Sequence, residues 1–295
     1  MTFPLALLLA CGTPEPSDAP APTPTTLDVA ALSFPAAWLA ERVGGEAVTV
    51  RNIAPPGEDP PHWQPPAEVV ASLGEADLIV ANGAGFEGWL ATASVPEERL
   101  VRAADGLDLI VLEGRTHSHG AAGEHSHAGT DPHTWSDPLA FLAEAKTVHQ
   151  ALARTAPAHT ATFDAGLTAL QSELTALHEA LDAALAPLRG RPLAANHPAF
   201  NYLARRYGLE LTSFDLDPEE PPGAEAVAAV LAWSTTAGDT PILLWESAPM
   251  DPVRQAFPAS FRHVTLDPLE QPATATYDYL AQARANVATL GSLGP

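Results

Sequence analysis

The sequence predicts an α/β fold of two lobes with mostly parallel sheets, joined by one long rigid helix. Apolar runs rich in β-branched residues alternate with helix-like stretches, a pattern typical of chains with parallel sheets. Leucines also recur every three or four residues within 160–188, which gives a single apolar stripe of helical period. With 295 residues, of which 46% are hydrophobic and 17% charged, the chain can bury the cores of about two domains.

The individual elements follow from these runs and from their flanking residues. Several helices are expected to begin with a proline behind a polar residue, as in Ser136-Asp137-Pro138, which suits a capped first turn. The expected strands are 27–34, 47–54, 76–82, 107–112, 192–196, 209–214, 241–246 and 262–266. The expected shorter helices are 35–43, 66–73, 138–155, 198–207 and 224–234.

The longest helix is expected over 160–188. At about 1.5 Å per residue it reaches roughly 40 Å, which is longer than one small domain. A helix that spans both lobes explains this length, whereas a plain bundle helix leaves the strands on either side unexplained. We therefore expect an N-terminal lobe over 27–159 and a C-terminal lobe over 189–295. The stripe consists of the leucines at positions 167, 170, 174, 177, 181, 185 and 188.

The N-terminal segment resembles a bacterial lipoprotein signal. The expected signal, 1–11, contains a short apolar run over 3–10 and ends at Cys11, the chain's single cysteine. Residues 12–26 form a proline-rich linker. The alternative is an ordinary secretory leader with an incidental cysteine, and the absence of Lys or Arg at residues 1–2 departs from the usual signal. In both cases the mature domain is expected in the periplasm or on the outer cell surface, with Cys11 as the site of a lipid anchor.

The charge balance limits the possible ligands. The chain has 14 Lys and Arg against 36 Asp and Glu, a net charge of −22. Nucleic acid is excluded as a partner because phosphate binding needs clustered cations, whereas a cation is favoured as a ligand. No apolar stretch approaches the ~20 residues of a membrane-spanning helix, so the only expected membrane contact is the lipid anchor.

A histidine-rich segment at 117–129 is expected to be a loop, because its Gly, Ala and Ser residues offer no means of packing. Short tracts rich in histidine are typical of metal binding, although a functionless loop is the alternative. The histidines concerned are His117, His119, His125 and His127, four of the 11 in the chain.

Four further residues follow the ends of predicted strands: His62, His133, His197 and Asp267. Ligands of open α/β sheets bind outside the carboxyl ends of the strands, so two residues from each lobe are expected to meet in a metal cleft between the lobes. Three imidazoles and one carboxylate fill a tetrahedral zinc site, although imidazoles also suit copper, nickel or iron. Each signal alone is weak, because a lone histidine in a loop is usually a surface residue. His263 is expected either beside this site or in the core.

The chain resembles the zinc- and manganese-binding substrate-binding proteins of bacterial ABC importers. The resemblance covers about 27–290 in the family's order and is carried by several motifs together. These are Pro55-Pro56-Gly57, Asp59-Pro60-Pro61-His62, Glu75-Ala76-Asp77-Leu78, Asp131-Pro132-His133-Thr134-Trp135-Ser136-Asp137-Pro138, His197-Pro198-Ala199-Phe200 and Leu266-Asp267-Pro268-Leu269.

The resemblance implies that His62, His133, His197 and Asp267 bind the metal, and that two α/β lobes are joined by a rigid helix. Histidine at the third position and the histidine-rich loop are typical of the zinc members, so Zn²⁺ is expected, with Mn²⁺ or Fe²⁺ as alternatives. The family usually has Asp-Pro-His, and the extra proline here, Pro61, is expected to bring Glu58 or Asp59 near the metal. Glu246 matches an acidic family position, either orienting a ligand histidine or serving as a buried structural carboxylate.

The function expected from these observations is capture of zinc outside the cytoplasm and its delivery to an ABC permease by a monomeric, non-enzymatic protein. A zinc-dependent hydrolase is a much weaker alternative, in which Asp267 is not a ligand and Glu246 acts as general base. No His-Glu-x-x-His pattern, nucleophile elbow or phosphate loop supports it. An adhesin-like surface protein with a structural metal is the third possibility.

Overall fold

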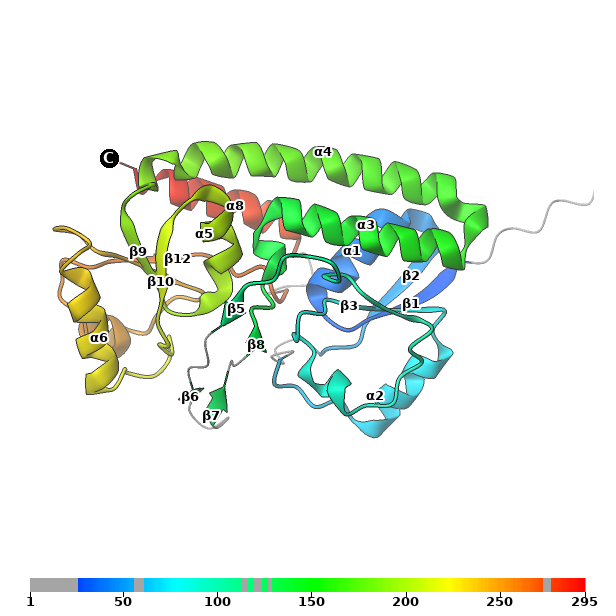
Figure 1. Ribbon diagram of the computed structural model, residues 1–295, viewed down its shortest axis with the longest axis horizontal. Coiled ribbons are helices and arrows are strands. Elements are labelled where there is room, and N and C mark those ends of the chain that lie inside the picture. Colours follow the sequence, from blue (N-terminus) through cyan, green and yellow to red (C-terminus); the bar gives the residue numbers. More distant parts are fainter. Residues whose placement is uncertain are drawn as a thin grey trace, which may run out of the picture.

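Two lobes lie side by side beneath one long helix in the computed structural model (Figure 1). The structure describes residues 26–55, 61–112, 116–118, 124–126, 129–272 and 277–294. The long helix, α4 (Thr160–Leu185), continues as a 3-10 turn, η7 (Ala186–Leu188), and runs over both lobes. The predicted fold class and the helix predicted over 160–188 are thus confirmed, whereas the lobe boundaries stay a prediction.

Each lobe contains a four-stranded parallel sheet, and the two sheets share one topology. In the first lobe the order is β2-β1-β3-β4, and in the second it is β10-β9-β11-β12. In each sheet the chain first adds a strand on one side of its first strand and then continues on the other side. Such a switch point leaves a crevice at the carboxyl ends of the two strands that flank it. The strands are β1 (Leu27–Ala31), β2 (Val48–Asn52), β3 (Leu78–Ala81), β4 (Leu100–Arg102), β9 (Pro192–Ala195), β10 (Glu210–Ser213), β11 (Ile242–Trp245) and β12 (Arg262–Thr265).

Several of the remaining helices pack against α4. The α-helices are α1 (Phe34–Gly44), α2 (Ala67–Ser72), α3 (Pro138–Thr155), α5 (Asn201–Tyr207), α6 (Ala224–Ser234), α7 (Asp251–Gln255) and α8 (Tyr279–Gly291). The other 3-10 turns are η1 (Gly45–Ala47), η2 (Leu73–Glu75), η3 (Gly88–Ala91), η5 (Thr134–Ser136), η6 (Pro157–His159) and η8 (Pro198–Phe200). α3 begins where predicted, because Asp137 caps it by accepting the Leu139 N–H at 2.9 Å.

The strand predicted over 107–112 is wrong as a member of the sheet. Only β5 (Val111–Leu112) forms there, and it pairs antiparallel with β8 (Gly129–Thr130) outside the main sheets. The fourth strand of the first sheet is β4, whose three half-buried residues are too few to form a recognisable pattern. In the histidine-rich segment, the backbones of β6 (Thr116–Ser118) and β7 (Glu124–Ser126) pair antiparallel.

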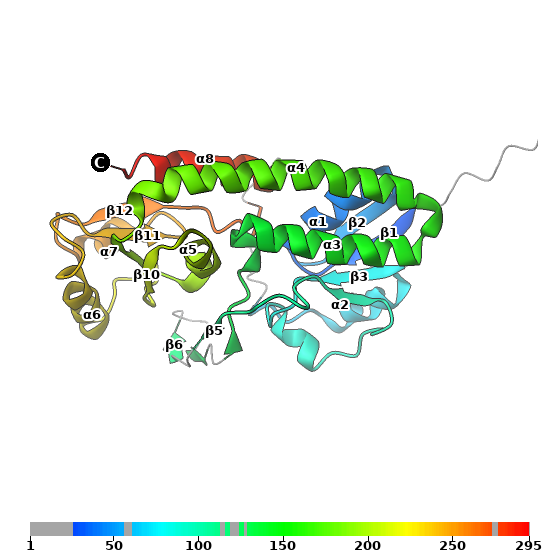
Figure 2. The same cartoon turned by 45° about the horizontal axis from the view of Figure 1, so that its top comes forward.

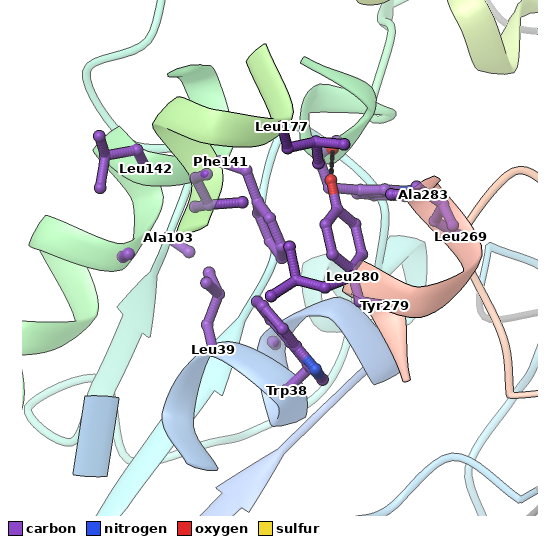
Figure 3. Packing of buried hydrophobic residues seen from close by; sticks show 14 of the residues in the cluster. Trp38, Leu39, Ala103, Phe141, Leu142, Leu177, Leu269, Tyr279, Leu280 and Ala283 are labelled. Atoms are coloured by element: carbon purple, nitrogen blue, oxygen red, sulfur yellow. Dashed lines mark hydrogen bonds between the residues drawn. The ribbon is translucent and has the colours of Figure 1, made fainter. Parts of the chain in front are cut away.

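The largest of three buried hydrophobic clusters among the described residues extends through both lobes. At its centre, the Trp38 ring packs against Phe141 and Tyr279, with centroid distances of 5.7 and 4.9 Å (Figure 3). The Tyr279 hydroxyl donates a hydrogen bond to the Trp135 backbone oxygen at 2.6 Å. The start of α8 is therefore packed against α1 and α3 of the first lobe, while α8 lies along α4 in both views (Figure 2). A shared, close-packed core opposes large relative motion of the lobes.

None of the helices in the described ranges combines the length and the apolar character that crossing a membrane requires. The predicted signal over 1–11, with its lipidation site Cys11, and the linker up to residue 25 lie outside the described residues.

Candidate metal centre

His133 is buried at the junction between β8 and η5, where Asp131 fixes its orientation. The Asp131 Oδ1 atom accepts hydrogen bonds from the His133 backbone N–H at 3.0 Å and from ring Nδ1 at 2.7 Å. We assign the ring proton to Nδ1 from this contact, because a carboxylate accepts and does not donate. The Nε2 lone pair is then the one available to a metal ion.

Three carboxylates surround this imidazole. The His133 Nε2 atom lies 3.8 Å from Glu270 Oε2, in the loop after β12. Burial lowers the pKa of His133, but the charge and hydrogen bond of Asp131, together with the charges of Glu270 and Glu246, outweigh it and raise the pKa above its ordinary value. The same negative field attracts a metal cation to the imidazole.

His197 reaches the same place from the second lobe. It follows β9 with an extended backbone, at the point where the order of the second sheet reverses between β9 and β11. Its ring centroid lies 5.2 Å from that of His133, and the two rings are nearly perpendicular, at 86°. Two of the predicted imidazoles thus lie close together, although β8, the strand before His133, belongs to neither main sheet.

Glu246 is tied to the residue beside His197. Its Oε1 accepts a hydrogen bond from Asn196 Nδ2 at 3.2 Å, and its backbone N–H donates to Asn196 Oδ1 at 2.9 Å. Asn196 also donates to the Leu216 carbonyl at 3.0 Å. This bridge joins the carboxyl ends of β9 and β11 and fixes the backbone from which His197 projects.

Asp267, the predicted carboxylate ligand, accepts hydrogen bonds from nearby residues in the structure. Its Oδ1 accepts hydrogen bonds from the Leu269 N–H and the Tyr277 hydroxyl, each at 2.8 Å. The side chain of Asn286 bonds both backbone groups of Asp267: it accepts from the Asp267 N–H and donates to the Asp267 carbonyl oxygen. The carboxylate that the structure places beside His133 is instead Glu270, which the sequence analysis did not select.

His62 lies half-buried in the segment after β2, next to the buried Trp63. The Trp63 ring packs edge-on against Trp89, with centroids 6.4 Å apart, which fixes the loop against the first lobe. Glu58 and Asp59, predicted to approach the metal, lie outside the described residues. The proposed shift caused by Pro61 therefore stays a prediction.

His263 and the histidines of the segment 117–129 were the remaining histidines considered in the sequence analysis. His263 accepts a hydrogen bond from Trp245 Nε1 at 3.0 Å and packs near Phe257 and Phe261, so of its two predicted places the core is observed. In the histidine-rich segment, the backbones of His117 and His125 are paired in β6 and β7. His119 and His127 lie outside the described residues, so a role for these four side chains stays a prediction.

Within the part of the chain that the structure describes, no three His, Cys, Asp or Glu side chains stand close enough to hold one metal ion together. The described pieces of a site are the pair His133 and His197 with Glu270 beside the first. Bonds from zinc to nitrogen and oxygen are about 2.0–2.2 Å long, so these groups have to converge by a short distance to share an ion. The donor set itself fits such an ion, since the ligand nitrogen of His133 is already oriented.

The sequence profile of the family described as "ZnuA: Zinc-uptake complex component A periplasmic" matches residues 29–292, nearly the whole chain. The chain belongs to the ZnuA family. The match extends over both sheets and the long helix α4.

Relatives and solved structures agree with this assignment. The chain is 26% identical to the zinc-binding lipoprotein AdcA of Streptococcus pneumoniae over 231 residues, which cover 75% of this chain and 44% of AdcA. It is 24% identical to the high-affinity zinc uptake system protein ZnuA of Bacillus subtilis over 237 residues, covering 77% and 73%. The match thus covers less than half the length of AdcA.

The structure of the Zn(II)-bound ZnuA-like domain of Streptococcus pneumoniae AdcA superposes with a TM-score of 0.75 at 21% identity. The superposition covers 90% of this chain and 98% of that domain. At this level of identity, the likeness establishes the common fold of the ZnuA family.

Proposed function

We propose that this protein captures zinc between its lobes outside the cytoplasm and delivers it to an ABC permease. The observation that carries the proposal is the proximity of His133, oriented by Asp131, to His197 from the other lobe and to Glu270. An oriented imidazole donor, a second imidazole and a carboxylate are characteristic zinc ligands. The names of the AdcA and ZnuA relatives, which refer to zinc, support the same ion.

The proposed ligands are His62, His133, His197 and Glu270. His62 is included on its motif, since it follows the first sheet at the position that the family resemblance implies. Glu270 replaces Asp267, because the Asp267 carboxylate already accepts two hydrogen bonds within its loop. Three imidazoles and one carboxylate complete a tetrahedral shell without an open position for a substrate, which suits binding and release.

Zinc is preferred to Mn²⁺ or Fe²⁺ for a chemical reason. Manganese favours carboxylate and carbonyl oxygens, whereas a set dominated by imidazole nitrogen suits zinc. A manganese or iron member of the same family is the alternative. Because first-row affinities rise from Mn²⁺ to Zn²⁺ at most sites, competition in vitro favours zinc in both cases. Cellular uptake of zinc and of manganese, compared between cells with and without the protein, separates the two.

The proposal extends to the tether and the loop. A lipid on Cys11 anchors the mature protein, and the proline-rich linker holds the lobes away from the membrane as a monomer that docks on the permease. The histidines at 117, 119, 125 and 127 act as an auxiliary site that collects zinc. Labelling with a radioactive fatty acid, compared between the parent and Cys11→Ala, tests the anchor.

Metal analysis of protein purified without added metal tests the site. We expect one equivalent of zinc in the parent and none in His197→Ala. His149→Ala is the matched control, because His149 bonds Asp164 on the surface of α3 and α4, away from the cleft. Full zinc content in His197→Ala, or its absence from the parent after zinc is supplied, contradicts the proposal.

A further inference from the structure

The carboxylate that orients His133 is held from the other lobe. Asn201, the first residue of α5, donates a hydrogen bond from Nδ2 to Asp131 Oδ2 at 3.0 Å. Asp131 therefore uses one oxygen for His133 and the other for Asn201. The side chain of Asp131 is fully buried, so these partners take the place of water.

The direction of the Asn201 amide is itself fixed. Its Oδ1 accepts a hydrogen bond from the Ser213 hydroxyl, at the end of β10, at 3.0 Å. Because the hydroxyl occupies the oxygen side, the NH₂ group faces the Asp131 carboxylate. Ser213, Asn201, Asp131 and His133 thus form one chain of hydrogen bonds that begins in the sheet of the second lobe and ends at a proposed zinc ligand of the first.

Tyr202, the next residue of α5, also contacts Asp131 of the first lobe, but at its backbone and not at its side chain. The Tyr202 hydroxyl donates to the Asp131 backbone oxygen at 2.8 Å and accepts from the Ile110 N–H at 3.0 Å. Tyr202 therefore fastens the backbone of this segment to α5, whereas Asn201 holds the carboxylate that contacts the imidazole. Contact between the lobes and orientation of the His133 ring thus depend on different residues and can be tested separately.

We propose that Asn201 is a positioning residue for the metal centre, which makes the orientation of His133 depend on the second lobe. The inference rests on the proposed function in that it takes His133 as a zinc ligand. Because α5 follows His197 through η8, one short segment of the second lobe sets the directions of both imidazoles. Without Asn201, the Asp131 carboxylate can turn, and the His133 ring loses its fixed Nδ1–H partner.

The test compares Asn201→Ala and Ser213→Ala with Tyr202→Phe as the matched control from the same helix. Zinc dissociation constants are measured by competition with a chelator, and the nitrogen and proton signals of the His133 ring are recorded by NMR in the metal-free protein. Asn201→Ala is expected to weaken zinc binding about ten-fold, the lower range for loss of an outer partner of a metal ligand. The His133 Nδ1–H signal should shift or broaden in parallel.

Ser213→Ala leaves the Asn201 bond to Asp131 intact. It should therefore change the zinc dissociation constant and the His133 Nδ1–H signal in the same direction as Asn201→Ala, but to a smaller extent. Tyr202→Phe should lower the melting temperature while zinc affinity stays within two-fold of the parent. Unchanged zinc affinity and unchanged His133 signals in Asn201→Ala overturn the proposal, as does an equal loss of affinity in Tyr202→Phe. If Asn201→Ala does not fold, Ser213→Ala decides by the same readouts.

If the proposed function is wrong, the same experiments give a different result. In that case the parent itself does not bind zinc, while the metal-free NMR comparison of Asn201→Ala with the parent still decides whether Asn201 positions the His133 ring. A changed ring signal supports the positioning role, and an unchanged one overturns it.

Discussion

Glu270 Oε2 lies 3.8 Å from His133 Nε2, which joins the loop after β12 to the buried imidazole of the first lobe. The loop is arranged for this approach. Asp267 accepts the Leu269 N–H, and Leu269 adopts a left-handed backbone, with φ at 61°, immediately before Glu270. A branched side chain rarely adopts this conformation, so the surrounding bonds must hold it. The Trp135 ring contributes one of them, donating from Nε1 to the Pro268 oxygen at 2.9 Å.

The first prediction follows from this division of roles between the two carboxylates. Glu270→Gln removes the charge next to His133 and should weaken zinc binding by at least ten-fold, measured by chelator competition. Asp267→Asn keeps the Oδ1 acceptor for the Leu269 N–H and should weaken it by less than about three-fold. A strong loss in Asp267→Asn together with a small one in Glu270→Gln would restore Asp267 as the ligand.

Much of the scaffold was predictable because its signals are local. The Asp137-Pro138 pair marked the start of α3, and the leucine stripe marked α4, whose buried face indeed carries Leu170, Leu174 and Leu177. Periodicity and capping act within a few residues, so they are legible in a single sequence. The histidine motifs likewise directed attention to His133 and His197, which the structure brings together.

What could not be predicted depends on tertiary geometry. The proposal of Glu270 in place of Asp267 depends on the left-handed backbone at Leu269, and no glycine in the sequence indicates that conformation. The segment containing Val111 looks like a sheet strand in its apolar run, yet that side chain is 72% exposed and its strand pairs outside the main sheet. The bond from Asn201 to Asp131 joins residues 70 positions apart, which no local pattern encodes.

The second prediction concerns the contact that seats α4 on α1. A Cβ atom added to Gly166 would lie 2.8 Å from the Arg42 oxygen and closer still to the Val43 oxygen, both in the backbone. Gly166→Ala should therefore destabilise the protein by about 1–3 kcal/mol through overpacking, despite the better helix propensity of alanine. Urea unfolding measures the change.

Gly74→Ala is the control, because an added Cβ there meets nothing within 4 Å. Its stability should stay within about 0.5 kcal/mol of the parent. Equal stabilities of Gly166→Ala and Gly74→Ala would show that α4 shifts away from α1 without cost, contrary to a rigid connection between the lobes.

The third prediction uses two adjacent arginines on α5. Arg206 donates from Nε to the buried Asp137 Oδ2 at 2.7 Å, and the same carboxylate caps α3. Arg206→Ala leaves that buried charge with fewer donors and should cost about 1–2 kcal/mol, since Arg206 itself is partly exposed. Arg205→Ala affects a contact with the exposed Asp108 and should cost less than about 1 kcal/mol. Thermal unfolding of the two variants reports the difference, and equal losses would contradict it.

The fourth prediction is a pH dependence of stability caused by Glu144, which is fully buried in α3. Burial raises the pKa of the Glu144 carboxyl from 4.5 to about 8, and the charges of Glu87 and Asp137 add to the rise. The folded state thus keeps a proton that the unfolded chain releases above about pH 4.5. The stability linked to this group is fully present below that pH and falls by about 1.4 kcal/mol per unit as pH rises toward 8.

Glu144→Gln keeps the size of the side chain and removes the titration. Urea unfolding of the metal-free protein between pH 5 and 8 should show the parent losing roughly 3–4 kcal/mol relative to this variant. Groups that do not interact with Glu144 contribute equally in both proteins, so the difference reports Glu144 together with the charges coupled to it. Glu225→Gln, on the exposed surface of α6, should follow the parent across the range. Parallel curves for the parent and Glu144→Gln would mean that the buried carboxyl does not carry its proton at neutral pH.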